Sequence, residues 1–325
     1  MPQYRIVGRR IASIPYAAGG AITIDLPRSY DYESIFLRLS GTSHVTVAAG
    51  AVRAEAPCQI VPRIEVIADG KNTLFSAPFW ATSLGRYDRA LIESGARACT
   101  PPSGFAIADY AYEAIGCIDF MTQDGLRAKD SNLRTRGFSM FQLRATFGQP
   151  GDIFTAGTVS HTGTPTLEVY TQELVELPDA KGQFSTPSSL RKVSQQRIAT
   201  AASNTALDMM LPAGNYVKSV VLRTEGNTTA GEPSTAQLNS AKLQSGLDVR
   251  ADMSGAQIRA KNNADYGQLT SGYYVLDVTS RGRAPSHLSD LWDLTGQPQP
   301  KVTLDVVGGA NNFVDAIVTE YILAR

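Results

Sequence analysis

The 325-residue chain has few cysteines, no excess of either charge and no long apolar run. Its three cysteines, Cys58, Cys99 and Cys117, lack CxxC spacing, which argues against a disulfide framework or a cysteine-rich zinc site. Lysine plus arginine and aspartate plus glutamate both number 30, so bulk charge does not favour nucleic-acid binding, and we expect no sequence-specific nucleic-acid partner. The composition also argues against disorder, because 43% of the residues are hydrophobic and 18% are charged.

Targeting and membrane-spanning signals are missing as well. No segment approaches the roughly 18 apolar residues that a spanning helix requires. The first twenty residues carry arginines but no continuous apolar core, so we expect no secretory signal and synthesis in a host cytoplasm. Small residues and glycines follow Arg5, Arg9 and Arg10. Residues 1–20 are therefore interpreted as an N-terminal arm whose arginines contact anionic lipid or nucleic acid, with an ordinary frayed terminus as the alternative.

The sequence also lacks the common signatures of catalysis. His44, His161 and His287 are scattered, without HxH or HExxH spacing. Neither a GxSxG elbow nor a GxxxxGK[ST] loop occurs. These patterns predict no catalytic residue, no metal and no cofactor.

Carboxylates recur at comparable positions in the two halves, Asp119 with Asp277 and Glu65 with Asp248. Paired carboxylates serve glycoside hydrolysis, but these pairs are related by duplication and are expected in separate domains. Asp248 and Asp252 have a spacing that calcium sites share with many other sequences, so it predicts no site.

What the sequence does contain is an internal repeat. Residues 26–41 read LPRSYDYESIFLRLSG and residues 211–226 read LPAGNYVKSVVLRTEG, with six identities in sixteen ungapped positions. Both segments alternate with the period of a β-strand, which places Arg38 and Arg223 on the face opposite the apolar side chains. The repeat predicts two copies of one all-β unit, with Arg38 and Arg223 as subunit-contact residues on outward strand faces.

Later segments follow in the same order in both halves. IEVIAD at 64–69 aligns with LDVRAD at 247–252, CIDF at 117–120 with VLDV at 275–278, and QLRATFG at 142–148 with TLDVVGG at 303–309. Each half then closes with a long β-type run, EVYTQELVEL and DAIVTEYILA. The falling offset places an insertion in the first copy, within residues 71–110, between its fourth and fifth strands.

The insertion contains one convincing helical pattern, because Trp80, Leu84, Tyr87 and Leu91 recur at helical spacing. The Ser-, Thr- and Gln-rich stretch between the copies is interpreted as a linker. The predicted organisation is an N-terminal arm at 1–20, a first β unit at 21–178 with the insertion 71–110, a linker at 179–205 and a second β unit at 206–325.

The paired LP…S..LR..G segments, the colinear later strands and the insertion together resemble the double jelly-roll major capsid proteins of tailless icosahedral viruses, especially membrane-containing bacteriophages. The resemblance covers nearly the full chain, although no short motif defines the family. It implies an all-β fold of two tandem eight-stranded jelly rolls. It also implies a virion capsid protein that forms homotrimers with a pseudo-hexagonal outline.

The resemblance further implies partners and exposed loops. The partners are neighbouring capsomers, minor capsid or vertex proteins, and an internal lipid membrane contacted by Arg5, Arg9 and Arg10 of the arm. The loops expected to project outward as towers are Lys71–Tyr110, Gln149–Pro165 and Asn227–Ser245.

Two other functions stay open at this point. A carbohydrate-binding β-sandwich protein, such as a surface lectin or a spike, is suggested by tyrosines that offer sugar-stacking surfaces, although tyrosines are also common in strands. These are Tyr30, Tyr32, Tyr110, Tyr112, Tyr273 and Tyr274. A β-sandwich hydrolase is disfavoured because no convergent acid–base set is present.

Overall fold

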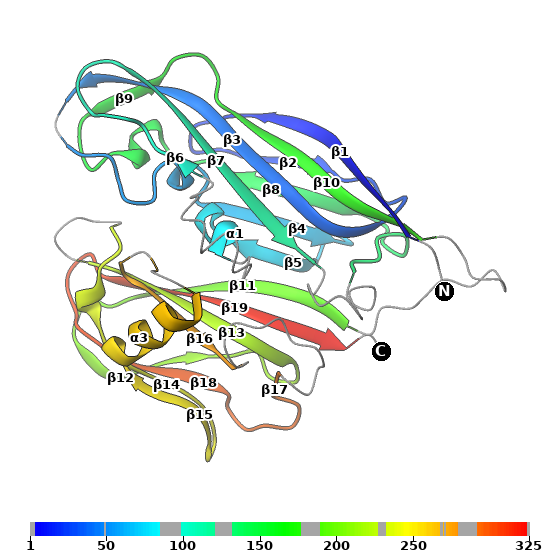
Figure 1. Cartoon of the computed structure of the whole chain (residues 1–325), viewed down its shortest axis with the longest axis vertical. Helices are drawn as coiled ribbons and strands as arrows, with labels where there is room; N and C mark the ends of the chain where they lie inside the picture. The colour runs from blue at the N-terminus through cyan, green and yellow to red at the C-terminus, as the bar shows by residue number, and fades with distance from the viewer. Residues whose placement is uncertain are drawn as a thin grey trace. The chain divides into compact units, whose positions relative to one another are not determined.

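The computed structural model describes residues 4–48, 50–84, 99–120, 132–176, 189–226, 232–266, 269, 271–278 and 291–323. These residues form two compact units, with the boundary between Lys192 and Val193 (Figure 1). Strands dominate both units, and the described α-helices are α1 (Phe79–Leu84) in unit 1 and α3 (Gly255–Tyr266) in unit 2. The predicted all-β class is confirmed.

Unit 1 is a sandwich of two antiparallel sheets. The first sheet has the order β1-β10-β3-β7, and the second has the order β5-β4-β8-β2. The strands are β1 (Tyr4–Pro15), β2 (Ala21–Asp25), β3 (Asp31–Val47), β4 (Arg63–Ala68), β5 (Asn72–Ala77), β7 (Asp109–Asp119), β8 (Phe141–Thr146) and β10 (Thr166–Glu176). Two short strands extend the first sheet, β6 (Cys99–Thr100) beside β7 and β9 (Thr158–His161) beside β3.

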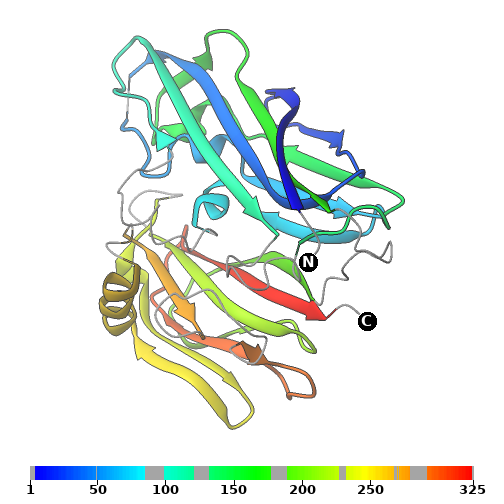
Figure 2. The ribbon, with the colours of Figure 1, turned by 45° about the vertical axis from the view of Figure 1, so that its right-hand side comes forward.

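Unit 2 repeats this plan with the sheets β11-β19-β13-β16 and β12-β18-β14-β15 (Figures 1 and 2). The strands are β11 (Ser189–Ala199), β12 (Asn204–Met210), β13 (Tyr216–Glu225), β14 (Leu238–Ser245), β15 (Asp248–Ser254), β16 (Tyr273–Asp277), β18 (Lys301–Val306) and β19 (Phe313–Leu323), with the short β17 (Trp292–Asp293) beside β13. When the eight main strands of each unit are numbered in chain order, the two sheets have the same strand orders in both units. These orders are first–eighth–third–sixth and second–seventh–fourth–fifth. Two jelly rolls with one topology confirm the predicted duplication.

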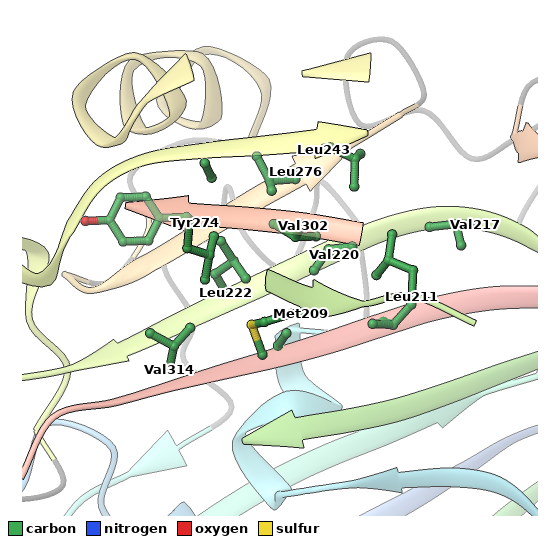
Figure 3. Close-up of a cluster of buried hydrophobic side chains, with 14 of the residues drawn as sticks. Met209, Leu211, Val217, Val220, Leu222, Leu243, Tyr274, Leu276, Val302 and Val314 are labelled. Carbon is green, nitrogen blue, oxygen red and sulfur yellow. The ribbon is translucent and has the colours of Figure 1, made fainter. Parts of the chain in front are cut away.

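The repeated segments occupy the same place in both units, because β3 and β13 are the third strands. Ile35, Leu37 and Leu39 of β3 are fully buried, as the alternation predicts. In unit 2, Val220 and Leu222 of β13 lie in a cluster of buried side chains between the two sheets (Figure 3). Each such side chain contributes about 1.5–3 kcal/mol when it is fully buried.

One of the later alignments is wrong. Residues 64–69 cover β4, the fourth strand of unit 1, whereas residues 247–252 lie on β15, the fifth strand of unit 2. The true counterpart of β4 is β14. Short alternating segments resemble one another, so a likeness over six residues with three identities does not distinguish neighbouring strands of a sheet.

The predicted N-terminal arm is also wrong for the described residues. Tyr4–Pro15 forms β1, the first strand of the jelly roll, and pairs with β10 from Tyr4↔Glu176 to Pro15↔Thr166. The edge of β10 supplies the hydrogen-bond partners that an isolated arm would lack. The predicted linker likewise contains β11, which is the first strand of unit 2. Each jelly roll therefore begins one strand earlier than the predicted boundaries at residues 21 and 206.

The predicted insertion contains more regular structure than expected. It includes β5, so the extra residues of unit 1 follow the fifth strand rather than the fourth. The first part of the predicted helix is present as α1, which is described as far as Leu84, and Tyr87 and Leu91 lie outside the described residues. In unit 2, α3 follows the fifth strand at the same point of the topology, and the sequence reasoning missed it.

The other two predicted tower loops are partly regular too. Gln149–Pro165 contains a short 3-10 helix, Pro150–Ile153, and β9, which pairs with β3. The described part of Asn227–Ser245 contains β14, the fourth strand of unit 2. Their outward projection in an assembly stays a prediction.

Candidate assembly surface and duplicated charge pairs

An alternating row of charges crosses the first sheet of unit 1 on the face away from its core. Arg10 of β1 pairs with Glu168 of β10 at 2.7 Å, and Glu168 pairs with Arg38 of β3 at 3.2 Å. Arg38 in turn pairs with Glu113 of β7 at 2.7 Å. We call Arg10, Glu168, Arg38 and Glu113 the charge ladder. It links the four main strands of the sheet, and its charges sum to zero.

The ladder holds its groups in their charged forms. Hydrogen bonds from Arg38 lower the pKa of Glu113, and bonds from Tyr170 and then Arg38 lower the pKa of Glu168. The same bonds, to Glu113 and then Glu168, raise the pKa of Arg38. Because Arg10, Arg38 and Glu113 are exposed, the ladder sets the pattern of charge on this face and adds little to stability.

Apolar side chains lie beside the ladder. Ile115 stands directly opposite Arg38 on β7, and its side chain is 42% exposed. Ile6 of β1 is 58% exposed. The exposed face thus combines apolar area with a self-neutralised row of charge.

Arg9, another predicted arm residue, makes a different contact from Arg10. Arg9 turns inward and makes a two-point contact with Glu173 of β10, with its Nε 3.0 Å from Oε1 and its Nη2 2.6 Å from Oε2. Glu173 is fully buried and also accepts a hydrogen bond from Thr171. Arg9 therefore neutralises a carboxylate at the end of the core. The side chain of Arg5 lies outside the described residues.

Arg223 is not on an exposed face, which corrects the expectation from the repeat. Its side chain is 2% exposed, and its Nη1 bonds to Glu225 and lies 3.4 Å from Oδ2 of Asp315. Arg197 of β11 reaches both acids, at 2.9 Å each. Gln195 donates to the other oxygen of Asp315 at 2.8 Å. We call Arg197, Arg223, Glu225 and Asp315 the buried charge cluster.

Burial dominates the electrostatics of Asp315. It raises the pKa of this carboxyl, and Arg197 and Arg223 oppose that rise. The neighbouring strand β13, which carries Arg223 and Glu225, is covered on both faces, because nine of its ten residues are buried. Alternation alone does not show this, since it separates two faces without saying whether each is covered.

The two arginines nevertheless belong to one duplicated pair. Arg38 stands directly opposite Glu168 on the eighth strand of unit 1, and Arg223 stands directly opposite Asp315 on the eighth strand of unit 2. An ungapped alignment of β10 with β19 matches Glu168 with Asp315. The same alignment matches Glu173 with Glu320, and both of these acids are fully buried. The sequence carried this signal in the closing runs of each half.

The carboxylates considered for catalysis lie in separate settings. Glu65 contacts Arg63 and Arg144, and Asp248 accepts hydrogen bonds from Arg250 and Trp292. Asp277 accepts the Tyr266 hydroxyl at 2.5 Å. Within the described ranges, no three His, Cys, Asp or Glu side chains gather in a way that would hold a metal ion.

The described histidines have different partners. His44 contacts Asp109 at 2.6 Å on the exposed face of β3. His161 turns inward at the opposite face of the same strand pair and contacts Tyr16 and Tyr112. His287 lies outside the described residues. None of the described helices has the length and apolarity needed to cross a membrane.

Similar proteins are found by comparison of structures and not by comparison of sequences. No family model and no curated protein matches the sequence. The major capsid protein of STIV, the Sulfolobus Turreted Icosahedral Virus, matches with a TM-score of 0.77 and 16% identity over 98% of this chain and 97% of its own. The major capsid protein of bacteriophage PM2 matches with a TM-score of 0.58 and 14% identity, over 98% and 97% of the two chains.

An assembled shell is also among the similar structures. The quasi-atomic model of the PBCV-1 virus capsid matches with a TM-score of 0.68 and 13% identity over 99% of this chain and 94% of that chain. The chain therefore has the fold of the double jelly-roll major capsid proteins, as the resemblance in the sequence implied. The match extends through both units, so neither jelly roll is an addition peculiar to this chain.

Proposed function

We propose that the chain is the major capsid protein of an icosahedral virus and that its copies form the virion shell. The observation that carries this proposal is the near-complete coverage, in both directions, between this chain and double jelly-roll major capsid proteins. The proposed role is structural and non-catalytic. The separate settings of the carboxylates and histidines support that role.

The duplicated fold suits a trimer. Three copies supply six similar jelly rolls, which give a pseudo-hexagonal outline around a threefold axis. A closed cyclic arrangement of this kind buries the same pair of surfaces at each interface. Trimers with such an outline tile a shell with few distinct contacts.

We place one of those contacts on the ladder face, meaning the outward face of β1, β10, β3 and β7, and its partner is a second copy of the chain. Two observations support this assignment. Ile6 and Ile115 leave apolar area exposed beside the ladder. The corresponding strand of unit 2 is buried on both faces, and Arg223, the counterpart of Arg38, is 2% exposed. The neutral ladder also avoids charge repulsion between copies.

The first test is the solution mass by light scattering after gel filtration. One chain has a mass of 34.8 kDa, so a trimer gives three times that value, about 104 kDa. A trimer that persists on dilution, with hexagonal particles in electron micrographs, supports the capsid proposal. A stable monomer contradicts it.

A pair of variants tests the ladder face separately. Ile115→Arg places a charge on this face, whereas Leu247→Arg places one on a fully exposed apolar side chain of unit 2. We expect Ile115→Arg to shift the trimer toward monomer and Leu247→Arg to leave it intact. A trimer in both variants would contradict the assignment of the face while leaving the capsid proposal standing.

A further inference from the structure

The short strand β9 is attached to unit 1 through a histidine that points into the sandwich. β9 pairs with β3, and His161 at its end stands directly opposite Ser43. The imidazole makes an edge-on contact with Tyr16, with ring centroids 4.7 Å apart, and a tilted contact with Tyr112 at 5.9 Å. His161 thus joins β9 to β3, to β7 and to the segment that precedes β2.

Several polar atoms of this cluster are buried without a well-formed hydrogen bond, whereas the Tyr16 hydroxyl donates to the Gly148 carbonyl at 2.7 Å. Neither ring nitrogen of His161 has a hydrogen bond of good geometry among the described residues, and only the Thr42 carbonyl acts as a weak acceptor toward the ring. The hydroxyls of Ser43, which is fully buried, and Tyr112, which is 3% exposed, likewise have no hydrogen-bond partner among the described residues. A neutral imidazole tolerates such a site far better than a cation does, because an ionised group in an apolar setting loses its solvation.

Among the residues that the structure describes, no charged side chain contacts the imidazole of His161. Burial lowers the pKa of the imidazole, and the Thr42 carbonyl opposes this only in part. Tyr16 and Tyr112 are the titratable groups that contact the ring, and burial raises the pKa of both, that of Tyr16 to about 12. Both therefore stay neutral near physiological pH. The charge of Asp152, in the 3-10 helix Pro150–Ile153, also raises the pKa of Tyr16.

A second histidine, His44, lies on the exposed face of β3 where β9 pairs with it. His44, the neighbour of Ser43 on β3, contacts Asp109 at 2.6 Å, and Asp109 also accepts the Thr162 hydroxyl at 2.9 Å. The His44 contact lowers the pKa of Asp109. Protonation of His161 places a charge without an ion-pair partner in a partly buried site.

We propose that His161 is an acid-sensitive latch that holds β9 on β3 at neutral pH and releases it in acid. The pKa of the docked imidazole lies below its ordinary value of about 6.5. Docking is therefore fully favourable above that value and weakens as the pH falls from 6.5 toward the docked pKa. Within that window the open fraction of the β9 segment rises by up to about tenfold per pH unit. This inference does not depend on the capsid proposal.

Hydrogen exchange of the full-length protein tests the latch. We compare the protection of the Thr158–His161 amides at pH 7.5 and pH 5.5, corrected for the intrinsic pH dependence of exchange. Protection in the wild type should fall at pH 5.5, by up to about tenfold. In His161→Phe, which keeps a ring and removes the titration, it should not fall.

His44→Gln is the matched control, because it alters the neighbouring histidine on the outer face. The loss of protection in acid should persist in this variant. Equal protection of the wild type at both pH values would overturn the proposal, and so would an equal loss of protection in His161→Phe.

A measurement on the wild type keeps the test valid even if His161→Phe does not fold. NMR titration of the three imidazoles identifies His161 as the signal that neither His44→Gln nor His287→Gln removes. A pKa below 6.5 for this signal supports the latch, and a value at or above 6.5 contradicts it.

Discussion

Removing the charge of Arg223 should destabilise unit 2 far more than the same change at its duplicated counterpart Arg38 affects unit 1. We choose methionine at both positions because it retains most of the aliphatic length and removes the guanidinium. Arg223 is 2% exposed and faces Glu225 and Asp315, which are themselves buried. Arg223→Met therefore leaves two buried carboxylates with one arginine instead of two.

The size of the expected loss of stability depends on the ion pairs that remain after the substitution. Breaking a buried ion pair by removing one partner costs about 3–5 kcal/mol, because the other charge is left without compensation. Arg197 still contacts both acids at 2.9 Å, and its side chain is 43% exposed. The expected loss is thus near the lower end, about 3 kcal/mol, or roughly a hundredfold in the unfolding equilibrium. Arg38→Met removes only exposed contacts, so we expect little change.

The assay uses the two tryptophans of the chain, because Trp80 lies in unit 1 and Trp292 in unit 2. In a Trp80→Phe background, the fluorescence of Trp292, whose side chain is fully buried, reports the unfolding of unit 2 in urea. Arg223→Met should lower the urea midpoint without changing the slope. A single-tryptophan Trp292→Phe background serves Arg38→Met in the same way.

The pH dependence gives a second, independent readout. Burial raises the pKa of Asp315, so the stability that this group contributes is present at low pH and is lost as the pH rises through its folded-state pKa. Arg223→Met removes a cation that opposes this rise, so the deficit should be larger at pH 8 than at pH 5. If Arg223→Met destabilises unit 2 no more than Arg38→Met destabilises unit 1, or if its deficit grows in acid, the buried charge cluster is not what holds these strands.

Two substitutions test the packing. A Cβ at Gly41 would lie 2.5 Å from the Tyr112 hydroxyl and 2.8 Å from Pro165, so Gly41→Ala should cost about 1–3 kcal/mol in urea unfolding, whereas Gly8→Ala meets nothing within 4 Å and should be neutral; equal effects would refute the steric argument. Leu222→Ala, in the core of unit 2, should cost about 2–5 kcal/mol by the same assay, and a loss below 1 kcal/mol would show that the core relaxes around the cavity.

The sequence predicted the features that rest on period-two alternation and on the repeat. Leu37 and Leu222 share a register in the third strands, and the structure buries both. What alternation does not reveal is the cover on the second face of a strand. Arg38 and Arg223 have the same position in the topology, yet one is exposed and the other is 2% exposed. Their difference depends on packing outside the strand, which no local pattern encodes.

The first strands and α3 were missed for different reasons. β1 reads as an arm because Arg9 interrupts its apolar face, and only the structure shows that Glu173 neutralises this arginine. In α3, Ile258, Asn262 and Tyr266 recur every four residues and are all buried, so a helical signal was present. The polar Asn262 interrupts the apolar pattern, so the sequence did not show an apolar helical face. Its side chain bonds to both backbone groups of Val275, at 2.7 and 2.8 Å, so a buried amide replaces an apolar contact.

The two duplicated charge pairs, Arg38 with Glu168 and Arg223 with Asp315, should differ in how well they tolerate an exchange of the acid and the arginine. In unit 1, exchanging the charges as Arg38→Glu with Glu168→Arg keeps a direct cross-strand pair on an exposed sheet, so the double variant should fold with little loss.

In unit 2, Arg223→Asp with Asp315→Arg keeps the same pair in the same register. However, the new arginine would face Arg197, and the new aspartate would face Glu225, inside a buried site. Like charges there are not screened by water, so this double variant should be far less stable than its unit 1 counterpart. Equal tolerance of the two exchanges in urea unfolding would mean that Arg197 and Glu225 do not fix the polarity of the cluster. A loss confined to unit 2 would show that burial fixes the polarity of a charge pair that is interchangeable on the exposed sheet of unit 1.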